Sequence, residues 1–146
     1  MSTISLLTFA DFEQMADAPG KQELIDGELI EMPPAKFRRM FLSKRLFGLL
    51  SSGATGSLAY FEMGYLIGSP ELAVEVLSPR NRASHIERKL TLYFAEGASE
   101  VWVIDPSNYT MLVYRATPEG VIRTAVTETY QSKYPAITLS ELFKTE

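Results

Sequence analysis

The chain has 146 residues, of which 46% are hydrophobic and 22% are charged, and its formal net charge at pH 7 is -4. This composition is typical of one soluble globular domain, which we expect over residues 1–146, and the absence of cysteine excludes disulfides and thiolate metal sites. No apolar run approaches the roughly 20 residues that span a bilayer, and the first residues lack the features of a signal peptide, so we expect a cytoplasmic protein without a membrane segment.

The first third of the chain predicts a short helix, a hairpin and a longer helix. Thr8 stands before FADFEQMA, with Asp11 three residues later, which is typical of a capped helix start. Asp26-Gly27 divides ELIDGELIEM and predicts a hairpin, because a type I′ turn needs positive φ at both central positions. The segment from Lys36 to about Ser52 predicts a helix, although its apolar stripe is irregular.

The rest of the chain predicts strands arranged around one strong helix. That helix, over residues 84–97, has an S-x-x-E capping box at Ser84 and Glu87 and a closing Gly97. The nearly continuous apolar run over 100–105 is typical of a strand that is buried on both faces. We therefore predict an α/β fold with a mixed central sheet. The other predicted elements are strands over 57–67, 71–77, 109–115 and 120–127, and a short helix over 138–144.

Glu75 is the first candidate for chemistry, because it lies in the middle of the apolar strand PELAVEVLSP. Strand side chains alternate between faces, so Ala73, Glu75 and Leu77 share one face. The common interpretation is a half-exposed sheet face. Glu71 lies at the strand entrance, where solvation is easy. Four residues of strand span about 13 Å, whereas ligands lie about 2 Å from a single Mg²⁺, so Glu71 and Glu75 do not share one ion.

Lys89 lies at the border of the apolar stripe of the predicted helix. The common interpretation is a lysine whose stem covers the core while its amine reaches water. His85 is expected to be exposed and structural, and Trp102 is expected to lie in the core. Asp105, followed by Pro106, is predicted to end its strand and to begin a turn rather than to bind a ligand.

Basic residues gather on the predicted helix that begins near Lys36. A solvated helix face is the common explanation, and a surface that contacts the phosphates of DNA is the sharper one. Walker, G-x-G-x-x-G, H-E-x-x-H and G-x-S-x-G patterns are absent, so nucleotide binding, zinc proteolysis and serine hydrolysis lack support. The candidate DNA-binding residues are Lys36, Arg38, Arg39, Lys44 and Arg45.

Several segments, in this order, resemble the Uma2 (Uma-two) family of nucleases, a branch of the restriction endonuclease-like PD-(D/E)XK superfamily. They are ELIDGELIEM, PELAVEVLSP, ERKLTLY, EGASEVWVIDP and MLVYR, and the block from Pro70 to Pro106 is the specific part. The resemblance implies a restriction endonuclease-like fold, in which helices flank the mixed central sheet. It also implies a DNA endonuclease that depends on Mg²⁺ or Mn²⁺.

The resemblance also implies the site residues. Superfamily members carry an Asp on one strand and a (D/E)-x-Lys on the next; the acids hold Mg²⁺ and the lysine positions the attacking water. Glu75 matches the acid in VEVLSP, so it is both a metal ligand and a catalytic residue by this resemblance. Leu77 stands where the lysine is expected, and the lysine has moved to the following helix, where ERKLTLY places Lys89.

The sequence departs from the family pattern at the other acid. Relatives carry Pro-Asp on an upstream strand, whereas FEMGYLIGSPELAVEV runs straight on. Loss of a ligand, absence of the segment that bears it, and a substitute acid all stay open. Our substitute is Glu62, which would face Glu75 across an antiparallel pair if residues 67–70 form a tight turn, and would face away after a slip of one residue. Glu23 is a further accessory acid.

Two hypotheses follow. In the first, the protein is a Mg²⁺-dependent DNA endonuclease, a homodimer, in which Glu75 and Lys89 converge on one cleft. In the second, it is a catalytically degenerate relative that acts as a dimeric nucleic-acid-binding or scaffold module. The missing Pro-Asp favours the second hypothesis, and the retained Glu75 and Lys89 favour the first. We expect Glu75→Ala to abolish Mg²⁺-dependent nicking of DNA and to leave the protein folded; unfolding would instead indicate a structural role for Glu75.

Overall fold

The computed structural model describes residues 6–16, 21–32, 37–53, 70–79 and 83–145. It divides into two compact units, Met1–Ala35 and Lys36–Glu146, and each unit is described by itself. The strand predicted over 57–67, with Glu62, and the basic residue Lys36 lie outside the described residues. The expectation of a single domain over 1–146 stays a prediction.

The first unit contains a capped helix and a hairpin. Thr8 accepts a hydrogen bond from the Asp11 backbone N–H and donates from its own backbone to the Asp11 carboxylate, so the predicted cap is confirmed. Asp26 and Gly27 have φ of 50° and 81°, as the hairpin prediction requires. A Cβ at Gly27 would lie 3.0 Å from the Cβ of Leu6, so this position also lacks room for a side chain. The elements are α1 (Phe9–Glu13), β1 (Lys21–Ile25) and β2 (Glu28–Met32).

The second unit is built on a four-stranded mixed sheet of order β3-β4-β5-β6. β3 and β4 are parallel, and a helix, α3, lies between them in the chain, whereas β4, β5 and β6 are antiparallel neighbours. The predicted α/β class with a mixed central sheet is therefore confirmed. The bounds are β3 (Leu72–Val76), α3 (Ala83–Ala95), β4 (Glu100–Asp105), β5 (Thr110–Thr117) and β6 (Gly120–Ala125).

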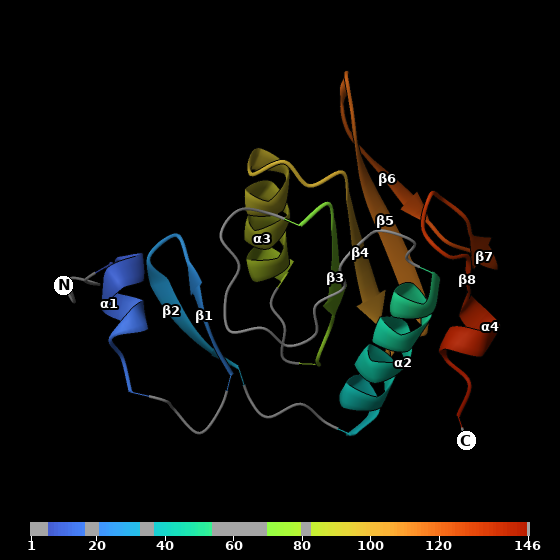
Figure 1. Cartoon of the computed structure of the whole chain (residues 1–146), viewed down its shortest axis with the longest axis horizontal. Coiled ribbons are helices and arrows are strands. Elements are labelled where there is room, and N and C mark those ends of the chain that lie inside the picture. Colours follow the sequence, from blue (N-terminus) through green and yellow to red (C-terminus); the bar gives the residue numbers. More distant parts are fainter. Residues whose placement is uncertain (1–5, 17–20, 33–36, 54–69, 80–82, 146) are drawn as a thin grey trace. The chain divides into compact units, whose positions relative to one another are not determined.

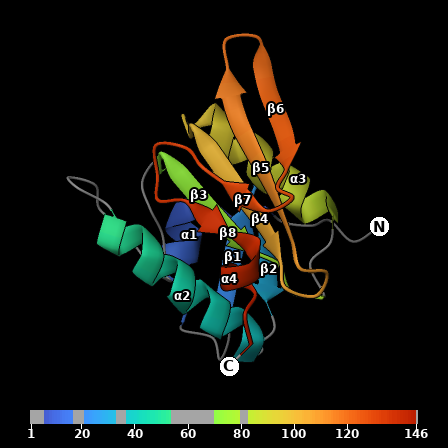
Figure 2. The same cartoon turned by 90° about the vertical axis from the view of Figure 1, so that its right-hand side faces the viewer.

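Helices cover both faces of this sheet (Figure 1). Trp102 and Ile104 of β4 point to the face that is covered by α2 (Phe37–Gly53) and α4 (Leu139–Leu142). Val101 and Val103 alternate to the other face, which α3 covers. Figure 2 shows the same sheet from the side of α2 and α4. A central strand that is buried on both faces explains why EVWVID is nearly all apolar.

The end of α3 follows a Schellman arrangement. The N–H of Gly97 donates to the Phe94 carbonyl at 3.2 Å, and the N–H of Ala98 donates to the Tyr93 carbonyl at 2.9 Å. Gly97 adopts φ of 102°, which a glycine tolerates at this position. The predicted stop is confirmed, but α3 begins at Ala83, so Ser84 lies inside the helix and not at its N-cap.

The C-terminal segment adds a small second sheet that the sequence did not predict. β7 (Thr129–Tyr130) pairs antiparallel with β8 (Ile137–Thr138), and α4 follows directly. Strands of two residues are too short to show a period, which explains why the pattern missed them. Of the segments that the structure describes, none forms a helix with the length and apolarity that crossing a bilayer requires.

Candidate functional site

Glu75 lies on the α3 face of the sheet. Its neighbours Ala73 and Leu77 both belong to the apolar cluster beneath α3, and strand alternation gives Glu75 the same direction. In the parallel register, Glu75 lies opposite Val103 of β4. The predicted division of β3 between the two faces is confirmed.

Two polar side chains of α3 meet the Glu75 carboxylate. The ammonium Nζ of Lys89 lies 2.8 Å from Glu75 Oε1, and the hydroxyl of Tyr93 donates to the same oxygen at 2.6 Å. Lys89 and Tyr93 are one helical turn apart, and side chains at that spacing lie on the same face of a helix. The prediction that Glu75 and Lys89 come together from different elements is confirmed.

Burial strengthens the interactions at this site. The side chains of Lys89 and Glu75 are only 13% and 14% exposed. Glu75 therefore does not lie on a half-exposed sheet face, and the Lys89 amine pairs with a carboxylate instead of reaching into water. Hydrogen bonds to an ionised carboxylate are stronger than neutral ones, and a low local dielectric increases their strength further.

The carboxylate has a second oxygen that could hold a metal ion. Both contacts go to Oε1, and no described residue donates a hydrogen bond to Oε2 of Glu75. Mg²⁺ commonly binds one or two carboxylates together with waters and substrate phosphates, so one carboxylate oxygen suits it. Within the described ranges, no group of three or more Asp, Glu or His side chains gathers at one point.

The structure does not test the remaining predicted acids. Glu62 lies in the part of the chain that the structure does not describe. Glu23 lies on β1, opposite Ile30 of β2, in the first unit. Their roles as metal ligand and accessory acid stay predictions.

Of the four predicted DNA-binding residues that the structure describes, two have partners within the protein. Arg45 Nη1 donates to the carbonyls of Glu141, Leu142 and Lys144, at 2.9, 3.2 and 2.9 Å, and so satisfies the end of α4. Arg38 stacks on the ring of Tyr109, with 4.5 Å from Cζ to the ring centroid. At the spacing of an α-helix, Arg38, Arg39, Lys44 and Arg45 of α2 do not all lie on one face. Binding of DNA by Arg39 and Lys44 stays a prediction.

Asp105 shapes a turn, as predicted. It is the last residue of β4, and its Oδ1 accepts hydrogen bonds from the backbone N–H of Ser107 at 2.8 Å and of Asn108 at 3.4 Å. Its Oδ2 accepts a third bond, at 2.7 Å, from the Asn108 side chain. These contacts account for the side chain without a ligand.

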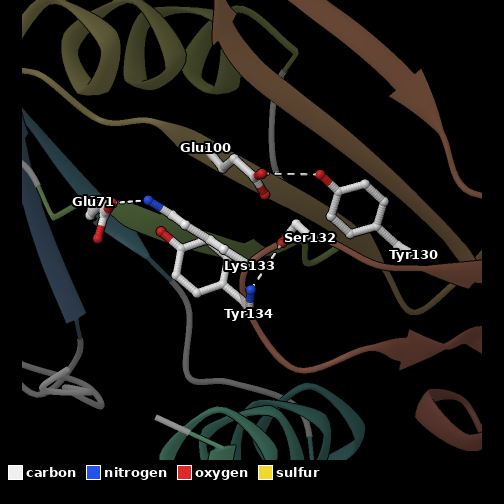
Figure 3. Close-up of polar contacts among 6 residues, drawn as sticks. All are labelled: Glu71, Glu100, Tyr130, Ser132, Lys133 and Tyr134. Atoms are coloured by element: carbon white, nitrogen blue, oxygen red, sulfur yellow. Dashed lines mark hydrogen bonds and ion pairs between the residues drawn. The ribbon is translucent and has the colours of Figure 1, made fainter. Parts of the chain in front are cut away.

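A second polar cluster, centred on Glu100, was missed by the sequence analysis (Figure 3). Glu100 is 4% exposed and is the one charged side chain among the buried residues that the structure describes. It accepts hydrogen bonds from Trp102 Nε1 at 2.9 Å and from the Tyr130 hydroxyl at 3.1 Å. The only signal in the sequence was a glutamate two positions before a core tryptophan, on the same strand face.

The segment around Tyr134 completes this cluster. The pKa of Tyr130 is raised, chiefly by burial and to a smaller extent by the charge of Glu100. The pKa of Tyr134 is also raised, chiefly by burial and to a smaller extent by the charge of Glu71. Lys133 forms an exposed ion pair with Glu71, and the hydrogen bond that Lys133 donates to the Glu71 carboxylate raises the pKa of Lys133. Trp102 meets both tyrosine rings edge-on, at 5.8 and 5.9 Å between centroids. The cluster therefore fastens the C-terminal segment to the sheet.

Comparisons with known proteins agree with this architecture. A crystal structure described as a "putative nuclease belonging to DUF820" from Anabaena variabilis matches with a TM-score of 0.74 and 15% sequence identity, over 94% of this chain and 97% of that chain. At that identity the likeness shows the fold, which is restriction endonuclease-like. No curated protein matches the chain.

The family match contains the residues that meet at the Glu75 carboxylate. The model of the Uma2 family, described as "Putative restriction endonuclease", matches residues 52–144, which include Glu75, Lys89 and Tyr93 but not the N-terminal hairpin. The match covers more than half of the sequence and includes the block from Pro70 to Pro106, on which the resemblance depended. The chain therefore belongs to the Uma2 family.

Proposed function

We propose that this protein is a Mg²⁺-dependent endonuclease that hydrolyses the phosphodiester bonds of DNA, with Glu75 as metal ligand and Lys89 as its catalytic partner. The observation that supports it is the 2.8 Å contact between Lys89 Nζ and Glu75 Oε1. A carboxylate and an ammonium from separate elements form the pair that a PD-(D/E)XK site needs, and they occur in a chain of a nuclease family.

Each residue has a defined part in this proposal. When bound, Mg²⁺ supplies charge neutralisation and a more acidic water. Glu75 Oε2 would hold that ion, since carboxylate oxygen is the ligand type that a hard cation prefers. Lys89 would place positive charge beside the phosphate and help to orient the attacking water. The 13% exposure of Lys89 keeps this charge poorly screened by solvent.

The test is nicking of supercoiled plasmid DNA with Mg²⁺, Mn²⁺ or EDTA. The wild type should nick DNA only with a divalent metal, and Glu75→Gln and Lys89→Met should reduce the rate at least about 100-fold, as expected for loss of a metal ligand or of a charged catalytic group. The exposed Glu71–Lys133 pair offers matched controls, since its members are 57% and 55% exposed. Glu71→Gln and Lys133→Met should retain nicking.

The second candidate function is the degenerate binding module. The observation in its favour is that Glu75 and Lys89 neutralise each other within the protein, as a structural ion pair would. A wild type that binds DNA in a salt-dependent way, but does not cleave it with Mg²⁺ or Mn²⁺, would replace the nuclease proposal with this one.

We also propose a homodimer in the cytoplasm. One site cuts one strand, and a two-fold dimer would present two sites to the two strands of a duplex. Light scattering after size-exclusion chromatography tests the assembly: a monomer at the concentrations that support nicking would contradict it. Fractionation of the producing cells tests the location.

A further inference from the structure

The Glu75 carboxylate is held unevenly. Its Oε1 accepts a hydrogen bond from the Tyr93 hydroxyl at 2.6 Å and lies 2.8 Å from the Lys89 ammonium. Its Oε2 accepts no hydrogen bond from the residues that the structure describes. The sequence predicted Tyr93 only as a member of the apolar stripe of its helix. In the structure its ring packs against the cluster beneath α3, as that prediction requires. The hydroxyl is an addition that this packing does not need.

We propose that Tyr93 is a positioning residue for the metal: together with Lys89 it fixes Oε1 and so presents Oε2 as the single metal-binding oxygen of Glu75. The inference rests on the proposed nuclease function and specifies how its site is oriented.

The physical reason is the rotational freedom of a glutamate. The terminal torsion of Glu is broad, so an isolated carboxylate can offer a metal either oxygen or both. Two charge-assisted hydrogen bonds that converge on one oxygen remove that freedom, most strongly where only 14% of the side chain is exposed. A single-oxygen contact leaves more positions on Mg²⁺ for water and a DNA phosphate than a two-oxygen contact does.

Tyr93→Phe removes the hydroxyl and keeps the ring. Tyr114→Phe is the matched control, because Tyr114 packs against the same cluster from β5 and makes no described contact with Glu75. Mn²⁺ affinity, measured by electron paramagnetic resonance well below the unfolding temperature, should fall about 10- to 100-fold in Tyr93→Phe, as is typical when the partner of a metal ligand is removed. Tyr114→Phe should bind Mn²⁺ as the wild type does.

The outcomes separate this inference from the proposed function. A Tyr93→Phe variant that melts at a lower temperature in EDTA, yet binds Mn²⁺ and nicks DNA like the wild type, would overturn the positioning role and leave the nuclease intact. A wild type that binds no Mn²⁺ would overturn both. If Tyr93→Phe does not fold, NMR of the wild type provides the test. The downfield signal of the Tyr93 hydroxyl should persist when Mg²⁺ is added, and its loss would overturn the inference.

Discussion

Lys89 Nζ lies 2.8 Å from Glu75 Oε1, and both side chains are largely buried between α3 and β3. Neither charge can be removed without leaving the other in a place that water reaches poorly. Breaking one side of a buried pair costs more than replacing both partners. This contact changes what a substitution at Glu75 is expected to do.

Glu75→Ala should lower the free energy of unfolding by roughly 2–4 kcal/mol, because it removes the buried carboxylate that pairs with the Lys89 ammonium. Whether Glu75→Ala stays folded, as expected from the sequence alone, then depends on whether the free energy of unfolding of the wild type exceeds this cost. Glu75→Gln should cost less, since its amide oxygen still accepts from Tyr93. Urea unfolding of both variants measures the difference, and equal costs would show that the hydrogen bond from Tyr93 does not contribute to stability.

Lys89→Met should also destabilise, by about 1–3 kcal/mol, because Tyr93 is then the one donor to Glu75 among the residues that the structure describes. The double variant Glu75→Gln/Lys89→Met should be more stable than Lys89→Met, since no unpaired charge remains. Nicking should be absent from both, while DNA affinity should change little, since one cation is a small part of a phosphate-contacting surface. Strictly additive stability costs would show that the two side chains are not coupled.

Much of the fold could be predicted because local rules and tertiary packing agree. Asp26-Gly27 specified its turn, and the two-residue period of β3 assigned Glu75 to one face. The pairing with Lys89 came from a family resemblance and a position at the edge of a stripe, not from periodicity. A hydrophobic pattern counts Tyr93 as apolar and says nothing about its hydroxyl, so the third member of the site was missed.

Other features depended on contacts between distant segments. The apolar stripe of α2 looked irregular because Arg38 and Arg45, seven positions apart and thus on one helix face, reach Tyr109 and the end of α4. Glu100 was missed because its partner Tyr130 lies on a two-residue strand. Sequence patterns detect a period along one element, and they do not detect which polar groups meet across several.

Arg45→Met should lower the free energy of unfolding by about 1–2 kcal/mol, since three carbonyls near the end of α4 lose their charged donor. Hydrogen exchange should speed up at Leu142, which is 2% exposed. Lys44→Met is the matched control: Lys44 is adjacent and exposed, so its loss should leave stability unchanged and weaken DNA binding slightly. Loss of DNA affinity in Arg45→Met without loss of stability would instead assign Arg45 to the DNA.

Tyr130→Phe tests the buried cluster through alkaline pH. Burial and then the charge of Glu100 raise the pKa of Tyr130 above its ordinary 10.0. A group whose pKa is raised by folding contributes its full stabilisation below the unfolded pKa and loses it as the pH rises through the folded pKa. At pH 7 the variant should be less stable by about 1 kcal/mol, since Glu100 loses one of its two donors.

The difference between wild type and Tyr130→Phe should shrink as the pH rises above about 10, because only the wild type can lose the Tyr130 proton on unfolding. Urea unfolding at a series of pH values measures it. The pKa of Lys133 is also raised, by the hydrogen bond that Lys133 donates to Glu71. Its effect on stability falls in the same pH range, but it is present in both proteins and cancels in the difference. If the Tyr130→Phe curve runs parallel to the wild-type curve over the whole series, the hydroxyl of Tyr130 does not attach the C-terminal segment to Glu100.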